Sequence, residues 1–154
     1  MRTVARLLPA LLFVTIGILC GCTAIKPLHV EREQRIAELH ERLSYSISRH
    51  GFSHGLRGTR EDGRSIDSIY ISISLDSLKR RHSSLEQMLT GVARICASKE
   101  FADVVIRIEV SAADDADMQY MYGLLTPGLA DAPHVQVTQV RDAVNDIVIT
   151  VAHR

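Results

Sequence analysis

The spacing of hydrophobic residues predicts one amphipathic helix near the start of the chain, followed by alternating strands and helices. In residues 31–50 apolar side chains recur every three or four positions among Arg and Glu, at Ile36, Leu39, Leu43 and Ile47. Gly51 follows this run and is typical of a helix end. The apolar stripe is narrow, so we expect the helix to pack along one seam, on the domain or on a partner.

Residues 51–65, GFSHGLRGTREDGRS, contain four glycines and alternating charges without a period, which predicts a surface loop. His50 and His54 are four positions apart, a spacing that suits metal ligands on one helical face. Gly51 and Gly55 argue against a helix there, and the other histidines have no Cys or acidic partner at ligand spacing. We therefore predict no metal site.

After residue 65, period-two hydrophobicity predicts two strands with a helix between them. The first strand carries alternate apolar residues at Ile69, Ile71, Ile73 and Leu75. Ser83 and Glu86 then form a capping box that marks a helix start. The buried stripe of this helix comprises Leu85, Met88, Leu89, Val92, Ile95 and Cys96. The second strand falls within residues 101–110, with Val104, Ile106, Ile108 and Val110 facing inward, and Arg107 and Glu109 facing outward.

Three acidic residues, Asp114, Asp115 and Asp117, precede the next helical segment, which runs to about Leu125. Such a cluster can belong to a calcium loop, but this one lacks a central glycine and a closing glutamate. Acidic residues at a helix N-terminus are favoured by the helix dipole. We adopt this second interpretation.

Two further period-two segments, at residues 135–139 and 147–151, complete the order βαβαββ behind the N-terminal helix. Each strand–helix–strand step implies parallel strands and a right-handed crossover, and the last two strands can close as a hairpin. We therefore predict an α+β fold, an α/β two-layer sandwich spanning residues 66–154. It would hold one mixed sheet with helices on one face, preceded by the amphipathic helix.

Residues 1–21 have the layout of a secretory signal peptide. Arg2 and Arg6 precede an apolar run from Leu7 to Leu19, and no acidic residue occurs before Glu31. This run is shorter than the roughly 20 residues that cross a bilayer core of about 30 Å. A transmembrane anchor is therefore the weaker interpretation.

The sequence Leu19-Cys20-Gly21-Cys22 resembles the bacterial lipobox, in which an apolar residue stands three before, and a small residue one before, an invariant cysteine. Cys22 fits this register and Cys20 does not. The resemblance implies that Cys22 carries the lipid as the first mature residue. The segment that follows is short and contains Pro27, so we expect residues 22–30 to form a tether. The following residue is Thr23 rather than Asp, which in this family points to the outer membrane. A cleaved signal that releases a soluble protein is the alternative.

Composition after cleavage narrows the chemistry of the protein. Removal of residues 1–21 from the 154 leaves 133, enough for one domain and a tether. The 18 basic residues fall to 16 with the loss of Arg2 and Arg6, against 18 acidic ones, and this balance gives no reason to expect nucleic acid. Cys96 would be the only unmodified cysteine, so we expect no internal disulfide and a buried structural thiol.

Residues 68–115 resemble the first half of an OmpA-like peptidoglycan-associated domain, and residues 145–151, NDIVITV, are similar to its final strand. The similarity rests on a strand, a loop with Ser74, Ser77 and Leu78, a helix with Leu85, Leu89 and Val92, and a second strand with Ile106, Ile108 and Glu109. It implies an α/β domain of about 85 residues that binds the diaminopimelate carboxylate of peptidoglycan.

The pocket that this resemblance implies is incomplete here. The family uses an Asp after the second strand and an Arg before the last one. Asp114 matches the Asp with a shift of one residue, whereas Asn145 or Asp146 stands in place of the Arg. Neither side chain offers the bidentate fork by which Arg holds a carboxylate. Asp114 and the nearest basic residue, Arg141, are the candidates for a displaced site.

No Gly-x-Ser-x-Gly elbow, phosphate loop or His-Glu-x-x-His helix occurs, so we predict neither an enzyme nor a cofactor. The leading hypothesis is a lipoprotein anchored in the outer membrane through Cys22, with a periplasmic α/β domain for binding or scaffolding. Two alternatives stay open. One is peptidoglycan binding through Asp114 and Arg141. The other is an accessory of a secretion or conjugation machine that docks on another envelope protein through residues 31–50.

Overall fold

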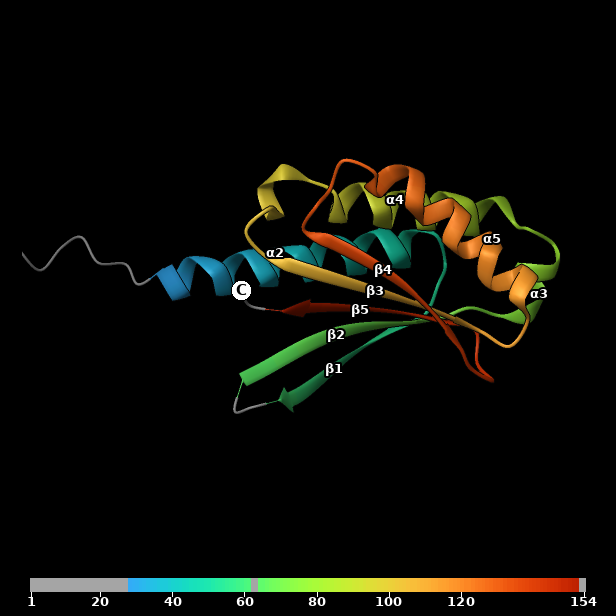
Figure 1. Cartoon of the computed structure of the whole chain (residues 1–154), viewed down its shortest axis with the longest axis horizontal. Coiled ribbons are helices and arrows are strands. Elements are labelled where there is room, and N and C mark those ends of the chain that lie inside the picture. Colours follow the sequence, from blue (N-terminus) through green and yellow to red (C-terminus); the bar gives the residue numbers. More distant parts are fainter. Residues whose placement is uncertain (1–27, 62–63, 153–154) are drawn as a thin grey trace, which may run out of the picture. The chain divides into compact units, whose positions relative to one another are not determined.

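The structure is a computed structural model that describes residues 28–61 and 64–152 (Figure 1). The chain divides into two units, residues 1–34 and 35–154, and the fold belongs to the second. Helix α2 begins in the first unit and continues into the second. In chain order the helices and strands are α2 (Leu28–Arg49), β1 (His54–Glu61), β2 (Arg64–Ser72), α3 (Leu75–Lys79), α4 (Ser83–Cys96), β3 (Val105–Ala112), α5 (Asp115–Leu125), β4 (Val135–Arg141) and β5 (Asp146–Ala152). Two 3₁₀ turns join them, η1 (Lys99–Phe101) and η2 (Thr126–Leu129).

The structure confirms the predicted α+β class, and it corrects the pairing of the last strand. The sheet order is β1-β2-β5-β3-β4, in which only β3 and β4 pair in parallel. Strand β5 lies between β2 and β3 and is antiparallel to both, so it does not form the predicted hairpin with β4. Strands β2 and β3 therefore run in the same direction with β5 between them. A central β5 has both edges hydrogen-bonded and its apolar row fully covered.

Alternating side chains give the sheet one apolar face and one polar face. Ile69, Ile149 and Ile108 form one continuous row across β2, β5 and β3, and all three are completely buried. The next row, on the opposite face, holds Thr150 beside Arg107. Helices α4 and α5 and residues 35–49 of α2 lie on the apolar face, where one hydrophobic core joins them to the sheet (Figure 1). The predicted inward and outward residues of β3 are confirmed.

The predicted surface loop at residues 51–65 is wrong. Residues 54–61 form β1, which pairs antiparallel with β2 from His54↔Ile71 to Glu61↔Arg64. The period-two signal is weak here because glycines and charged residues occupy most positions, and Leu56 remains 66% exposed at the sheet edge. Strand β2 begins at Arg64 and stops at Ser72, so Leu75, predicted as an inward strand residue, instead opens α3 and is exposed.

Helix α2 contains the predicted amphipathic helix and ends in a Schellman motif. Gly51 has φ +81°, the left-handed conformation that glycine adopts without steric cost. The Gly51 amide donates to the Ser48 carbonyl at 2.9 Å and the Phe52 amide to the Ile47 carbonyl at 3.3 Å. Phe52 packs against the core, and this contact fixes the direction in which the chain leaves the helix.

Helix α4 begins with a different cap from the predicted one. The N-cap is His82, whose Nδ1 accepts from the Ser84 amide at 3.4 Å, and Ser83 is the first helical residue. The predicted buried stripe is confirmed except for Ile95, which is partly exposed. Helix α5 starts as predicted, with Asp114 as its N-cap.

Candidate functional site

The two residues predicted for ligand binding, Asp114 and Arg141, lie where strands β3 and β4 end, and Asp114 already has a structural role there. Its Oδ1 accepts a 2.7 Å hydrogen bond from the Ala116 amide and so caps α5. Cys22, the predicted lipid attachment residue, lies outside the described residues.

Arg141 ends β4 opposite Ala112 of β3, next to the start of α5. Its Nε lies 4.0 Å from Oδ1 of Asp115, and the two side chains are 74% and 68% exposed. An ion pair this exposed contributes little to stability. The structure therefore places Arg141 in the same neighbourhood as Asp114, although the carboxylate that Arg141 faces is the adjacent one, Asp115.

Asp146, one of the two residues that stand where the OmpA-like pattern has an arginine, is a buried carboxylate. It is 3% exposed and accepts a hydrogen bond from the Tyr70 hydroxyl. This hydrogen bond is the main reason that the pKa of Tyr70 is raised, with smaller contributions from burial and from the negative charge of Asp146. A further carboxylate would be repelled by the negative charge of Asp146 at this point.

A larger concave surface lies between α2 and α4, on the helical layer. It is a groove of about 710 Å³, lined by residues from Arg42 to His50 on one wall and from Glu86 to Ile95 on the other. The two helices approach closely at Gly91, where an added Cβ would stand 2.9 Å from Oγ of Ser46. Glycine therefore permits this approach without displacing Ser46.

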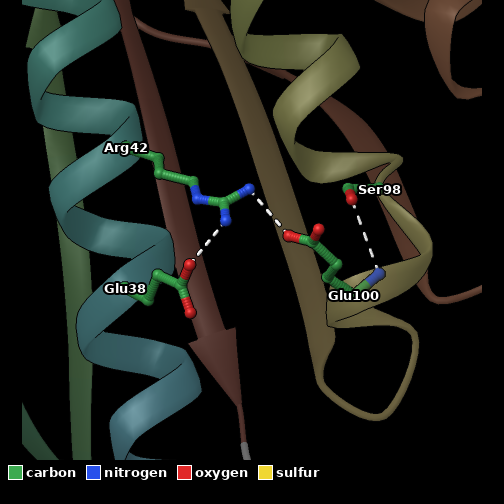
Figure 2. A network of polar contacts seen from close by, with 4 residues as sticks. All are labelled: Glu38, Arg42, Ser98 and Glu100. Atoms are coloured by element: carbon green, nitrogen blue, oxygen red, sulfur yellow. Dashed lines mark hydrogen bonds and ion pairs between the residues drawn. The ribbon is translucent and has the colours of Figure 1, made fainter.

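Three arginines and one glutamate supply the ionic side chains of the groove, and two of these four are already engaged. Figure 2 shows Arg42 between two carboxylates, with Glu38 at 2.5 Å and Glu100 at 2.7 Å. The hydrogen bond to Glu38 is the main reason that the pKa of Arg42 is raised; burial opposes this effect, and the negative charge of Glu100 adds to it. Arg42 also stacks over the Phe101 ring, 5.5 Å from its centroid. Ser98 supports this end of the groove because its Oγ accepts from the Glu100 amide at 3.4 Å.

The only glutamate of the groove, Glu86, binds an α5 side chain. Tyr120 donates from its hydroxyl to Glu86 Oε1 at 3.0 Å. Burial, and then this hydrogen bond, raise the pKa of Tyr120. In the part of the chain that the structure describes, Arg49 and Arg94 form no ion pair with any carboxylate. The groove thus presents two cations to solvent.

Cys96 is the one thiol within the described residues, and it has the properties of a structural residue. Its side chain is completely buried, and burial raises its pKa to about 12. The thiolate is the reactive form of cysteine, so Cys96 is inert near neutral pH. The nearby His134 is also buried, and its Nε2 donates to the Cys96 carbonyl at 2.9 Å rather than to the thiol.

Among the described side chains, no group of three or more His, Cys, Asp and Glu could hold a metal ion. No helix in the described ranges has the length and hydropathy needed to cross a bilayer. The chain matches no protein-family model, and no curated protein matches it significantly.

Sequence reasoning did not predict the groove. The spacing of apolar residues predicts α2 and α4 separately, with stripes that are correct except for Ile95, but the side-by-side placement of the two helices has no local signal. Gly91, a glycine inside a strongly periodic helix, is the one residue that pointed to close helix packing.

Proposed function

We propose that this protein is a lipoprotein anchored in the outer membrane through Cys22, and that its periplasmic α/β domain is a non-catalytic binding or scaffolding module. The anchoring half rests on the register of Leu19, Gly21 and Cys22, which resembles a lipobox. Several acyl chains hold a protein firmly, because each buried CH₂ contributes about 0.8 kcal/mol. Thr23 after the cysteine favours the outer membrane.

The binding half rests on one observation, the open groove between α2 and α4 with two arginines that form no ion pair with any carboxylate in the described ranges. A concave surface with uncompensated charge suits a ligand of opposite charge. The burial of Cys96 supports a binding role over thiol catalysis, because burial raises the pKa of this thiol to about 12 and so keeps it in the unreactive neutral form near neutral pH.

Metabolic labelling with palmitate tests the anchor. Wild-type protein is expected to incorporate labelled palmitate and to sediment with the outer membrane. Cys22→Ala should lose both properties. Cys20→Ala is the matched control, because it removes a cysteine two residues away that lies outside the lipobox register, and it should be labelled like wild type. Equal labelling of wild type and Cys22→Ala, or no labelling of either, would contradict the proposal.

Peptidoglycan binding is the second candidate, and one observation favours it: Asp114 and Arg141 lie at the same sheet edge, around the start of α5. Sedimentation with purified sacculi tests it. Asp114→Asn keeps an N-cap residue while removing the charge, so it separates binding from helix stability. If peptidoglycan is the ligand, Asp114→Asn and Arg141→Gln should each reduce the bound fraction. Binding unchanged by both variants would rule out this site.

The role of an accessory in a secretion or conjugation machine remains a variant of the first proposal. In that role the docking surface would be residues 31–50, and the part of this segment from Arg42 to His50 forms one wall of the groove.

A further inference from the structure

The groove between α2 and α4 combines exposed apolar area with two cations that have no carboxylate partner among the described residues. We propose that it binds an acidic segment of a partner protein, in which carboxylates contact Arg49 and Arg94 and an apolar side chain contacts Tyr45. This inference rests on the proposed function, because it names the partner class of the binding module.

The charge argument follows from how each ionic group in the groove is used. Arg42 is held by Glu38 and Glu100, and the carboxylate of Glu86 accepts from Tyr120. Arg49 on the α2 wall and Arg94 on the α4 wall remain without a carboxylate among the described residues. Carboxylates are good partners for such guanidinium groups, since both can form paired hydrogen bonds. The occupant that complements these two walls is therefore acidic.

Exposed apolar area in the same groove favours a protein segment. Tyr45 is 69% exposed, although large apolar side chains elsewhere on α2 within residues 35–49 are buried. Ile95, on the opposite wall, is only partly buried. Tyrosine and arginine are the residue types that most often dominate the energy of protein interfaces. A segment with an apolar residue between acidic ones would use both kinds of contact.

The length of the groove separates a protein segment from a small anion. Its walls extend from Arg42 to His50 and from Glu86 to Ile95, which at 1.5 Å per residue is about 12 Å along the first wall and about 14 Å along the second. A single phosphate or lipid headgroup would contact only a fraction of this length. Two turns of a helix, or four extended residues, would fill it.

Fluorescence anisotropy with designed peptides tests the proposal on the full chain, purified in detergent. The probe is a labelled amphipathic peptide of Glu, Leu and Ala, compared with analogues in which Gln or Lys replaces every Glu. The Glu peptide is expected to bind, the Gln peptide to bind more weakly and the Lys peptide not to bind. Added salt should weaken binding of the Glu peptide, since the contacts are partly solvent-exposed.

Charge reversal in the groove supplies the decisive comparison. Arg49→Glu with Arg94→Glu should weaken binding of the Glu peptide by at least about tenfold. The matched control is Lys79→Glu with Arg107→Glu, which makes the same change in charge on α3 and on the open face of the sheet. It should change the affinity by less than about twofold, as expected from the long-range field alone. Arg49→Gln with Arg94→Gln replaces the first variant if that variant fails to unfold cooperatively.

Four results would overturn the proposal: no binding of the Glu peptide, equal binding of the Glu and Lys peptides, equal weakening in the two double variants, or concentration-dependent self-association that Arg49→Glu with Arg94→Glu abolishes. The last result would assign the groove to a second copy of the chain. Because the titration does not depend on Cys22, a failure of palmitate labelling would refute the anchor and leave this inference standing.

Discussion

Replacement of Gly51 by alanine is expected to destabilise the domain by about 1 kcal/mol, although it removes no contact. Gly51 holds φ +81° at the end of α2, and an added Cβ would meet no atom within 4 Å. The entire effect therefore arises in the backbone. The left-handed conformation costs a residue with a Cβ roughly 1–2 kcal/mol. Alanine also reduces the entropy of the unfolded chain, which offsets about 0.4–1 kcal/mol of this cost.

Two further variants separate these contributions. Gly51→Asn should destabilise less than Gly51→Ala, because asparagine enters the left-handed region more readily than alanine. Gly55, in β1, also has open space around its Cβ position but lacks a positive φ, so Gly55→Ala keeps only the favourable entropy change. It should leave stability unchanged or slightly increased.

Urea unfolding followed by circular dichroism measures all three variants against wild type. The midpoint should fall for Gly51→Ala without a change in slope, since the surface exposed on unfolding is the same. Equal midpoints for Gly51→Ala and Gly55→Ala would refute the argument that the Schellman motif fixes the end of α2. That end places Arg49 and His50 in the groove, so the result also bears on the site.

Three other predictions concern the core and its titratable groups. Leu43→Ala should reduce the free energy of unfolding, measured by urea titration, by about 2–5 kcal/mol, because Leu43 is completely buried. Tyr45 lies two residues further on and is 69% exposed, so Tyr45→Ala should change the free energy of unfolding by about 0.5 kcal/mol or less. Cys96 should not react with a thiol reagent in the native protein at neutral pH but should react fully in guanidinium chloride, and fast labelling of the native protein would contradict its burial. Because burial raises the pKa of Cys96, the contribution of the neutral thiol to stability is present below the unfolded pKa and is lost as pH rises toward 12. Tyr70, whose pKa is raised chiefly by its hydrogen bond to Asp146, should ionise at higher pH than an ordinary tyrosine, and its contribution to stability should be lost only as pH rises through this raised pKa. Ultraviolet difference titration of wild type against Tyr70→Phe measures the pKa of Tyr70, and Asp146→Asn should lower that pKa.

The sequence predicted those parts of the fold that depend on local periodicity. The apolar stripes of α2 and α4 and the inward residues of β3 follow directly from spacing, because a helix or strand that buries one face must repeat its apolar residues at its own period. The start of α5 was also predictable, since Asp114 serves the N-terminal amides of the helix whatever else surrounds it.

The position of β5 could not be read from the sequence. Its residues Ile147, Ile149 and Val151 would suit a hairpin with β4 as well as the central place that β5 occupies. Strand order is decided by which apolar rows meet across the whole sheet, and that depends on residues far apart in the chain. The β1–β2 hairpin had a local signal that the abundance of glycine concealed. Asp62-Gly63 is a dipeptide typical of hairpin connections, and the paired residues Glu61 and Arg64 flank it.

The candidate site was the least predictable feature, because it depends on two helices, α2 and α4, that are separated in the sequence by β1, β2 and α3. Arg49 and Arg94 carry no mark in the sequence that distinguishes them from other surface arginines. Their significance comes from lying on opposite walls of one groove, while Arg42 and Glu86 are occupied by other partners. Asp114 and Arg141, chosen by resemblance, lie near each other, but one of them caps a helix and the other faces Asp115.

Mass spectrometry of the mature N-terminus tests the central claim, a lipid-anchored binding module, most directly. The protein would be extracted from membranes and digested, and its N-terminal peptide identified. We predict a peptide that begins at Cys22 and carries acyl groups, with residues 1–21 absent. An unmodified peptide that begins at any other residue, Met1 included, would contradict the account.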